Sequence, residues 1–302
     1  SAALDSFTTY HGKDTLYLFN GKENELSLEL PHEGKILTTK TLFFQSETNT
    51  LANGDEQLKM VSDLGNGKQV IFEYNLPKDS YILKSNIRLI GFQNELAKTQ
   101  DIPMTWVTKA ERTEKDVTNE RLNFQNHFTF ADGDHDYFTI ERTNEEKLEE
   151  PVKWFGVRTH FFNSTIIADK PFKNGSYVGT VNVDDTTHIG TNKTTLNITA
   201  QATNDFSFGF EWLISPNEYK LLKSFDAGLD EMVQLGFGPF AFVKYGSKWL
   251  IIPLFDFLSQ YTSSFGWIIV LMTIIIRLAL SFFTYKSQKS TAKMRVLKPE
   301  ID

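Results

Sequence analysis

The stretch from Phe265 to Phe283 reads FGWIIVLMTIIIRLALSFF and decides the class of this protein. Fifteen of its nineteen residues are apolar, and Arg277 carries the only charge. At about 1.5 Å per residue, a helix of this length spans roughly 28 Å, close to the ~30 Å hydrocarbon core of a bilayer. We therefore predict a membrane-spanning helix over residues 265–284. The alternative is a buried helix of a water-soluble protein, which rarely runs this far with a single charge.

The charges on the two sides of this helix differ in sign. Residues 285–302 carry five basic side chains against two acidic ones, whereas residues 1–276 carry 25 basic and 36 acidic side chains. The basic side chains after the helix are Lys286, Lys289, Lys293, Arg295 and Lys298. Because basic flanks stay in the cytoplasm, we predict that residues 285–302 begin a cytoplasmic helical region and that the N-terminal part is exported.

The whole chain has 302 residues, no cysteine and a net charge of −7. This composition excludes disulfide frameworks, thiolate zinc sites and cysteine nucleophiles, and it argues against nucleic acid as a partner. The first residues, SAALDSFTTY, contain no basic region and no apolar run, although an exported domain needs a signal or an earlier membrane helix. We therefore expect a piece of a longer protein, with further segments before residue 1 and after residue 302.

Residues 1–214 are predicted to form an all-β domain, a large sandwich. Short runs rich in β-branched and aromatic residues recur, among them VIFEY at 70–74 and FSFGFEWLI at 206–214. Turn-forming residues separate several of these runs, at 53–55, 65–67, 132–133 and 174–175. Ten or more strands in one domain need two packed sheets to bury their apolar faces.

At Ser215 the pattern changes to helical spacing. Ser215 and Pro216 have the character of a helix start, and apolar residues follow at spacings of three and four. These features predict a connecting helix over residues 215–237.

Residues 238–264 are strongly apolar and aromatic, but two lysines, Pro253 and Asp256 interrupt them. We predict an amphipathic helix that lies in the membrane interface on the outer side. The aromatic residues expected at headgroup level are Trp249, Tyr261 and Trp267. A re-entrant or spanning helix is the alternative.

The order of these features resembles the YidC membrane protein insertases. The residues that carry the resemblance are PNEYKLLKSFDAGLDEMV (216–233), the amphipathic segment with Pro253-Leu254, the apolar helix with one arginine, and KSQKSTAKMRVLKPEI (286–301). WFGVRTHFFNSTII (154–167) also resembles a segment of the periplasmic β-sandwich found in Gram-negative members.

The resemblance implies a non-enzymatic insertase and chaperone of the bacterial inner membrane, multi-pass at full length, with a large periplasmic domain. The implied partners are nascent membrane proteins, components of the Sec translocon, membrane lipids and, through regions outside this chain, the ribosome. No cofactor is implied. No metal site is expected either, because the histidines lack ligand spacing.

Arg277 is the candidate functional residue, because a charge in mid-membrane costs about 2.5–3.5 kcal/mol and needs a reason. Thr273, Arg277, Ser281 and Thr284 follow helical spacing and form one polar stripe. The resemblance places Arg277, with Thr273 and Ser281 beside it, in a hydrated groove that receives polar parts of a substrate. Snorkelling to the headgroups and a structural ion pair remain alternatives.

A second class of function competes with the insertase. It is a single-pass, membrane-anchored periplasmic binding module, of the sensor or carbohydrate-binding type. Trp106 and Trp154 are its candidate sugar contacts, although both also suit buried core positions. The polar stripe discriminates between the two classes, because a plain membrane anchor has no use for it.

Overall fold

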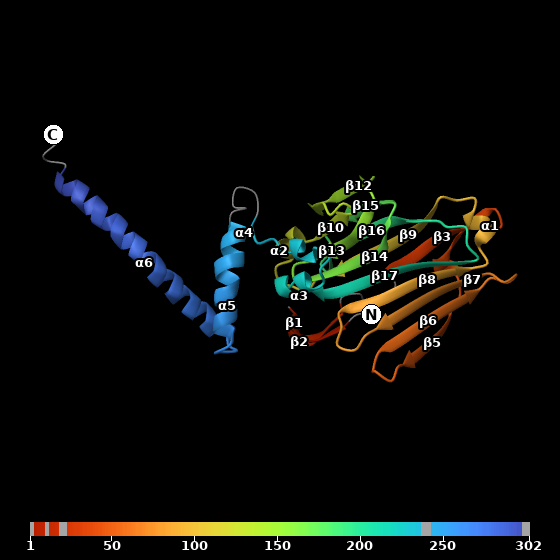
Figure 1. Cartoon of the computed structure of the whole chain (residues 1–302), viewed down its shortest axis with the longest axis horizontal. Helices are drawn as coiled ribbons and strands as arrows, with labels where there is room; N and C mark the ends of the chain where they lie inside the picture. Colours follow the sequence, from red (N-terminus) through yellow and green to blue (C-terminus); the bar gives the residue numbers. More distant parts are fainter. Residues whose placement is uncertain (1–2, 10–11, 18–22, 237–242, 298–302) are drawn as a thin grey trace. The chain divides into compact units, whose positions relative to one another are not determined.

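The computed structural model of the chain describes residues 3–9, 12–17, 23–236 and 243–297. It contains two compact units, which divide between Met232 and Val233. The first unit consists mainly of antiparallel strands and the second of helices (Figure 1). The predicted fold class, a large β-sandwich followed by helical segments, is confirmed.

The larger sheet of the sandwich has nine strands, in the order β11-β10-β13-β14-β17-β8-β7-β6-β5. Every neighbouring pair is antiparallel. In chain order the strands are β5 (Gln45–Thr50), β6 (Glu56–Asp63), β7 (Gln69–Leu76), β8 (Ile82–Ile90), β10 (Gln125–Phe130), β11 (His135–Thr139), β13 (Val152–Arg158), β14 (Phe162–Phe172) and β17 (Asp205–Pro216).

The smaller sheet has six strands, in the order β12-β15-β16-β9-β3-β4. In chain order they are β3 (Glu25–His32), β4 (Lys35–Thr38), β9 (Asp101–Glu111), β12 (Thr143–Leu148), β15 (Asn174–Thr180) and β16 (His188–Thr199). A separate hairpin joins β1 (Ala3–Thr9) to β2 (Gly12–Tyr17). The short helices of this unit are η1 (Thr39–Thr41), α1 (Gln93–Leu96), α2 (Val117–Leu122), α3 (Tyr219–Ser224) and η2 (Leu229–Met232).

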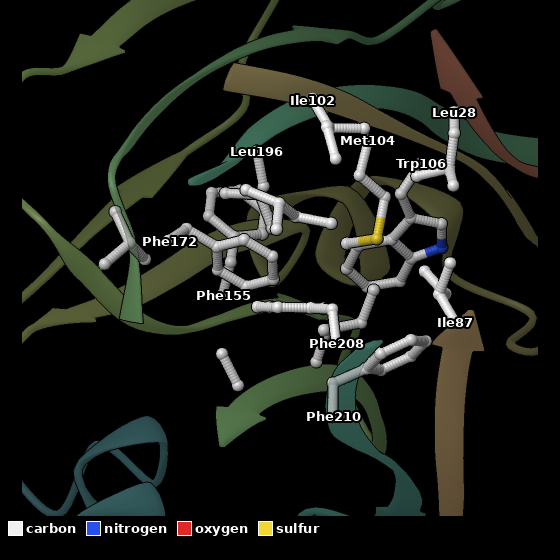
Figure 2. Packing of buried hydrophobic residues seen from close by; sticks show 14 of the residues in the cluster. Leu28, Ile87, Ile102, Met104, Trp106, Phe155, Phe172, Leu196, Phe208 and Phe210 are labelled. Carbon is white, nitrogen blue, oxygen red and sulfur yellow. The ribbon is translucent and has the colours of Figure 1, made fainter. Parts of the chain in front are cut away.

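The main core lies between the two sheets, as Figure 2 shows. Strand β9 alternates buried and half-buried residues along its whole length, the pattern of a strand with one face in a core. Its Trp106 meets Phe155 of β13 edge-on at 6.4 Å and Trp212 of β17 at 5.8 Å, measured between ring centroids. Trp106 is 1% exposed and Trp154 is 0% exposed, so the buried-core interpretation of both is confirmed.

Three of the four predicted turn sequences form turns between adjacent strands. Glycines at positive φ occur at Gly54, Gly133 and on both sides of Asn66, which agrees with the turns predicted at 53–55, 65–67 and 132–133. The turn predicted at 174–175 is wrong, because these residues begin β15. Gly175 serves packing instead: a Cβ there would lie 2.9 Å from a methyl group of Leu196.

The helix predicted from Ser215 begins later and is interrupted. Strand β17 continues through Pro216 because it pairs with β14, and Asn163 of β14 donates its side-chain N–H to the Ser215 hydroxyl at 3.1 Å. Helix α3 then starts at Tyr219. Positive φ angles at Asp226 (50°) and Gly228 (74°) end the helical path before the 3₁₀ turn η2.

The segment from α3 to η2 covers the outer face of the nine-stranded sheet. The indole N–H of Trp154 donates to the carbonyl of Ala227 at 2.8 Å. Leu222, Leu229 and Met232 are fully buried. A second, smaller core therefore lies on this face, and the first compact unit includes the segment up to Met232.

The outer face also holds a buried polar cluster on β10, β11 and β13. The Gln125 side-chain oxygen accepts from Arg158 Nη1 at 2.8 Å and lies 3.1 Å from His127 Nε2. His127 Nδ1 lies 3.2 Å from His135 Nε2. Burial, together with the positive charges of His135 and Arg158, holds the pKa of His127 well below its usual range.

We expect acidification to destabilise the β domain through His127. In the unfolded chain the pKa of a histidine is about 6.5, whereas the pKa of His127 in the folded domain is lower. At pH values between these two pKa values, only the unfolded state binds the proton. The free energy of unfolding should therefore fall with decreasing pH, by up to about 1.4 kcal/mol per pH unit. Denaturant unfolding between pH 7.5 and 5 measures this slope. His127→Gln should flatten it; an unchanged slope in this variant contradicts the prediction.

Candidate functional site

Helix α6 (Phe265–Leu297) carries the candidate site. Its first 25 residues, Phe265–Lys289, are long and apolar enough to cross a membrane, and within the described residues it is the one helix of this kind. At about 1.5 Å per residue they extend roughly 37 Å. Most of the large apolar side chains of this segment are exposed, as expected of a helix that faces lipid or other helices. The helix continues without a break through Leu297; residues 298–302 lie outside the described part.

Where one amphipathic helix was predicted, three helical segments follow one another without a break over residues 243–259. They are α4 (Val243–Gly246), the π-helical turn η4 (Ser247–Ile251) and α5 (Ile252–Ser259). Residues 238–242 of the predicted helix lie outside the described residues. The π-helical turn η4 ends just before Ile252 and Pro253. Pro253 has no N–H to donate, and in a regular α-helix its ring would clash with the carbonyl four residues earlier, which accounts for the wider turn at this place. The amide of Ile252 closes this turn on the Ser247 carbonyl.

The three predicted interface aromatics come from different parts of this unit. Trp249 lies in η4, Tyr261 follows α5, and Trp267 lies in the first turn of α6. All three side chains are exposed. The rings of Phe255 and Phe265 stack with centroids 6.2 Å apart, so α5 and the start of α6 pack together beside them. The position of the three aromatics in a membrane interface stays a prediction.

Three of the four residues of the polar stripe predicted on α6 line one shallow hollow along the helix. The hollow has a volume of about 440 Å³ and is lined by Arg277, Leu280, Ser281, Thr284, Tyr285 and Gln288. Tyr285 and Gln288 were not among the predicted residues. Gln288 is detectable from the sequence, because it lies seven residues after Ser281 and so falls on the same helical face. Thr273 lies one turn before Arg277 and is exposed.

The hydroxyl groups of the stripe donate to carbonyls of their own helix. Thr273 donates to Ile269 at 2.8 Å, Ser281 to Leu278 at 2.7 Å and Thr284 to Leu280 at 3.0 Å. Such bonds satisfy a hydroxyl donor inside an apolar helix. The charge of Arg277 has no comparable compensation on α6, because residues 265–299 contain no Asp or Glu.

Arg277 is exposed, and within the described residues no carboxylate lies in salt-bridge distance of it. Arg277 lies twelve residues, about 18 Å along the axis, from Phe265 and nine residues, about 13 Å, from Lys286, where the basic flank begins. A side chain that reaches roughly 6–7 Å cannot bring its charge to either end, which disfavours snorkelling.

The predicted basic region follows the stripe on the same helix. Lys286 and Lys289 are exposed. Lys293 and Arg295 belong to the last turns of α6, and their side chains lie outside the described part. The described residues contain no group of three histidine or carboxylate side chains that would hold a metal ion.

Two family models match most of the chain. Residues 1–250 match the family model described as the YidC periplasmic domain, and residues 257–302 match the model described as 60Kd inner membrane protein. Membrane protein insertase YidC of Parabacteroides distasonis is 28% identical over 311 residues, which cover 100% of this chain and 48% of that protein. The protein of the same name from Amoebophilus asiaticus is 28% identical over 306 residues, or 99% of this chain and 50% of that protein.

The chain therefore spans about half the length of these relatives. Among solved structures, a quadruple mutant of the α-N-acetylgalactosaminidase NagBb from Bifidobacterium bifidum aligns with 74% of this chain and 36% of its own. The TM-score is 0.44 and the sequence identity is 10%.

Proposed function

Since the chain belongs to the YidC family of membrane protein insertases, we propose that the full-length protein moves transmembrane segments from the cytoplasm into the inner membrane and helps them fold. The chain is part of a bacterial inner-membrane protein with a large periplasmic domain. The process needs no catalytic site and no cofactor. Transfer of the substrate's apolar surface into lipid, at ~25 cal/mol per Å², supplies the free energy.

The observation that carries the proposal is the exposed charge of Arg277 at the middle of the apolar segment Phe265–Lys289 of α6. A lone arginine there is costly in lipid, and a hydrated groove removes that cost. We propose that Arg277, Thr273 and Ser281 form one wall of this groove and that helices of the full-length protein form the others. Acidic or polar tails of a substrate would pass Arg277 and be attracted to its charge.

The remaining assignments extend this proposal. Nascent membrane proteins are the substrates, with delivery either direct or through the Sec translocon; a ribosome contact would use regions outside this chain. We propose that the β domain lies in the periplasm, that Trp249, Tyr261 and Trp267 lie in the outer membrane interface, and that α6 crosses the bilayer. Lys286, Lys289, Lys293 and Arg295 then hold its C-terminal end in the cytoplasm.

Insertion of a purified substrate tests the function directly. The full-length protein, reconstituted alone into vesicles, should insert a single-span substrate with a short acidic translocated tail. A membrane-anchored binding module would not do so. Vesicles with the protein that insert no more substrate than empty vesicles would contradict the proposal.

The topology is tested by reporter fusions in the full-length protein. Alkaline phosphatase, which is active only in the periplasm, should stay inactive when fused after Asp302. The matched fusion after Met232 should be active. The positive flank of α6 is the physical reason for this orientation. Phosphatase activity after Asp302 would overturn it.

A further inference from the structure

Strand connections gather at the two ends of the sandwich, and the chain leaves the β domain at one of them, here called the exit end. Strand β17 ends there, beside the start of β8 and the β13–β14 connection. The side-chain N–H of Asn217, just after β17, donates to the carbonyl of Thr159 in that connection at 2.9 Å. Figure 1 shows α2 and α3 at the exit end and α1 at the opposite end.

More large apolar side chains are exposed at the exit end than at the opposite end. The described connections of the opposite end, residues 33–34, 64–68, 91–100, 131–134 and 200–204, expose none. At the borders of this end, Ile36 next to the 33–34 turn and Phe43 just before β5 are exposed. The exposed large apolar residues of the exit-end connections and their borders are Leu51, Leu76, Tyr81, Leu122, Phe161 and Val183.

Three of these residues form what we call the exit-end trio: Leu122 (60% exposed), Phe161 (43%) and Val183 (69%). They come from three connections that hydrogen bonds tie together. The Arg121 guanidinium donates to the carbonyls of Asn182 at 2.9 Å and Val183 at 3.2 Å, which joins α2 to the β15–β16 connection.

The β13–β14 connection is joined to the same group. Its His160 pairs with the carboxylate of Glu114, which precedes α2. Asn217 donates to the carbonyls of His160 and Phe162 at 3.2 Å each. The trio is therefore presented by braced loops, so little ordering is needed when a partner covers it.

We propose that the exit-end trio inserts into the periplasmic lipid surface of the membrane that α6 crosses. The chain leaves the β domain at this end, and the 32 residues from Val233 to Ser264 connect it to α6. This tether keeps the exit end at a high effective concentration near the bilayer, so a few shallow apolar contacts suffice. Residues 112–123 carry three basic and three acidic side chains, and Asp184 and Asp185 follow Val183, so the apolar side chains and not electrostatic attraction must supply the contact with anionic lipid. The inference rests on the membrane location and is independent of the insertase proposal.

Fluorescent labelling tests the contact, because the chain contains no native cysteine. The environment-sensitive dye NBD is attached to Phe161→Cys or Val183→Cys of the full-length protein, in phosphatidylethanolamine–phosphatidylglycerol vesicles that contain no other protein. Lys98→Cys and Ala202→Cys, both exposed at the opposite end, are the matched controls. The exit-end labels should shift to the blue, and lipids spin-labelled near the headgroup should quench them at least twofold. The controls should show neither change.

Two results would overturn the proposal. Equal quenching at both ends would show that the domain approaches lipid without a preferred face. A blue shift without quenching by lipid would mean that protein, either a second copy or another part of the chain, covers the trio.

A variant of the trio gives an independent measurement. Leu122→Ser, Phe161→Ser and Val183→Ser are combined, and the label is placed at Tyr81→Cys, which lies at the same end. Lipid quenching of this label should fall to half or less, with an unchanged circular dichroism spectrum. Ile36→Ser combined with Phe43→Ser removes exposed apolar residues outside the exit end and should leave the quenching unchanged. Full quenching in the triple variant would overturn the role of the trio.

Discussion

Replacing Arg277 with alanine or glutamate is expected to reduce insertion of substrates with acidic translocated tails by about tenfold. Two unit charges 4 Å apart attract each other by about 1 kcal/mol in water and about 4 kcal/mol at an effective dielectric constant of 20. A partly hydrated groove lies between these limits, and about 1.4 kcal/mol corresponds to a factor of ten. Arg277→Lys should keep most of the activity, because attraction between charges needs no bidentate geometry.

Moving the charge along α6 provides a matched control for this experiment. Arg277→Ala combined with Ser281→Arg returns the charge to the polar stripe one turn later and should restore part of the activity. Arg277→Ala combined with Ala279→Arg places it on the opposite face, about 200° around the helix, and should not. Insertion is measured with acidic-tailed and neutral-tailed substrates in vesicles with equal amounts of protein.

The alternatives for Arg277 give different results in the same series. If the arginine belonged to a structural ion pair, alanine would strand a buried partner at a cost of ~3–5 kcal/mol, and protein abundance would fall. If the arginine only snorkelled, alanine would be nearly silent for all substrates. Normal insertion of acidic-tailed substrates by the alanine variant would end the groove hypothesis for this protein.

The second large effect is expected on the stability of fragments of the β domain that end at different residues. A fragment of residues 1–232 should fold, whereas a fragment of residues 1–214 should be mostly unfolded or aggregated. The shorter fragment loses the cover over Trp154, including Leu222, Leu229 and Met232, all fully buried. At about 1.5–3 kcal/mol for each buried side chain, the loss is comparable with the 5–15 kcal/mol stability of a typical domain. Circular dichroism and denaturant unfolding of the two fragments measure the difference.

A point variant separates this packing effect from a general effect of truncation. In the 1–232 fragment, Leu222→Ala should lower the free energy of unfolding by about 2–5 kcal/mol, because it opens a cavity under α3. The neighbouring Lys223 is exposed, so Lys223→Ala should change it by less than about 1 kcal/mol. If the 1–214 fragment proved as stable as the longer one, residues 215–232 would not belong to the folded domain.

The sequence by itself determined the features that depend on a local, one-dimensional pattern. Hydrophobicity over nineteen residues is enough to predict the apolar helix, because a span depends on length and composition. The face shared by Arg277 and Ser281 follows from the helical repeat alone, and Gln288 could have been found in the same way. Alternating residues, as in β9, likewise predict strands with one buried face and hence a sandwich.

The tertiary structure decided the features that depend on residues far apart in the chain. Ser215 has the sequence character of a helix cap, but pairing with Asn163 keeps it in β17, because ladder hydrogen bonds outweigh a local preference. The spacing of the apolar residues after Tyr219 predicts a longer helix. In the structure the helix ends before Ala227, whose carbonyl accepts a hydrogen bond from the indole N–H of Trp154. The trio of Leu122, Phe161 and Val183 has no sequence signature, because it exists only where three connections of two sheets end side by side.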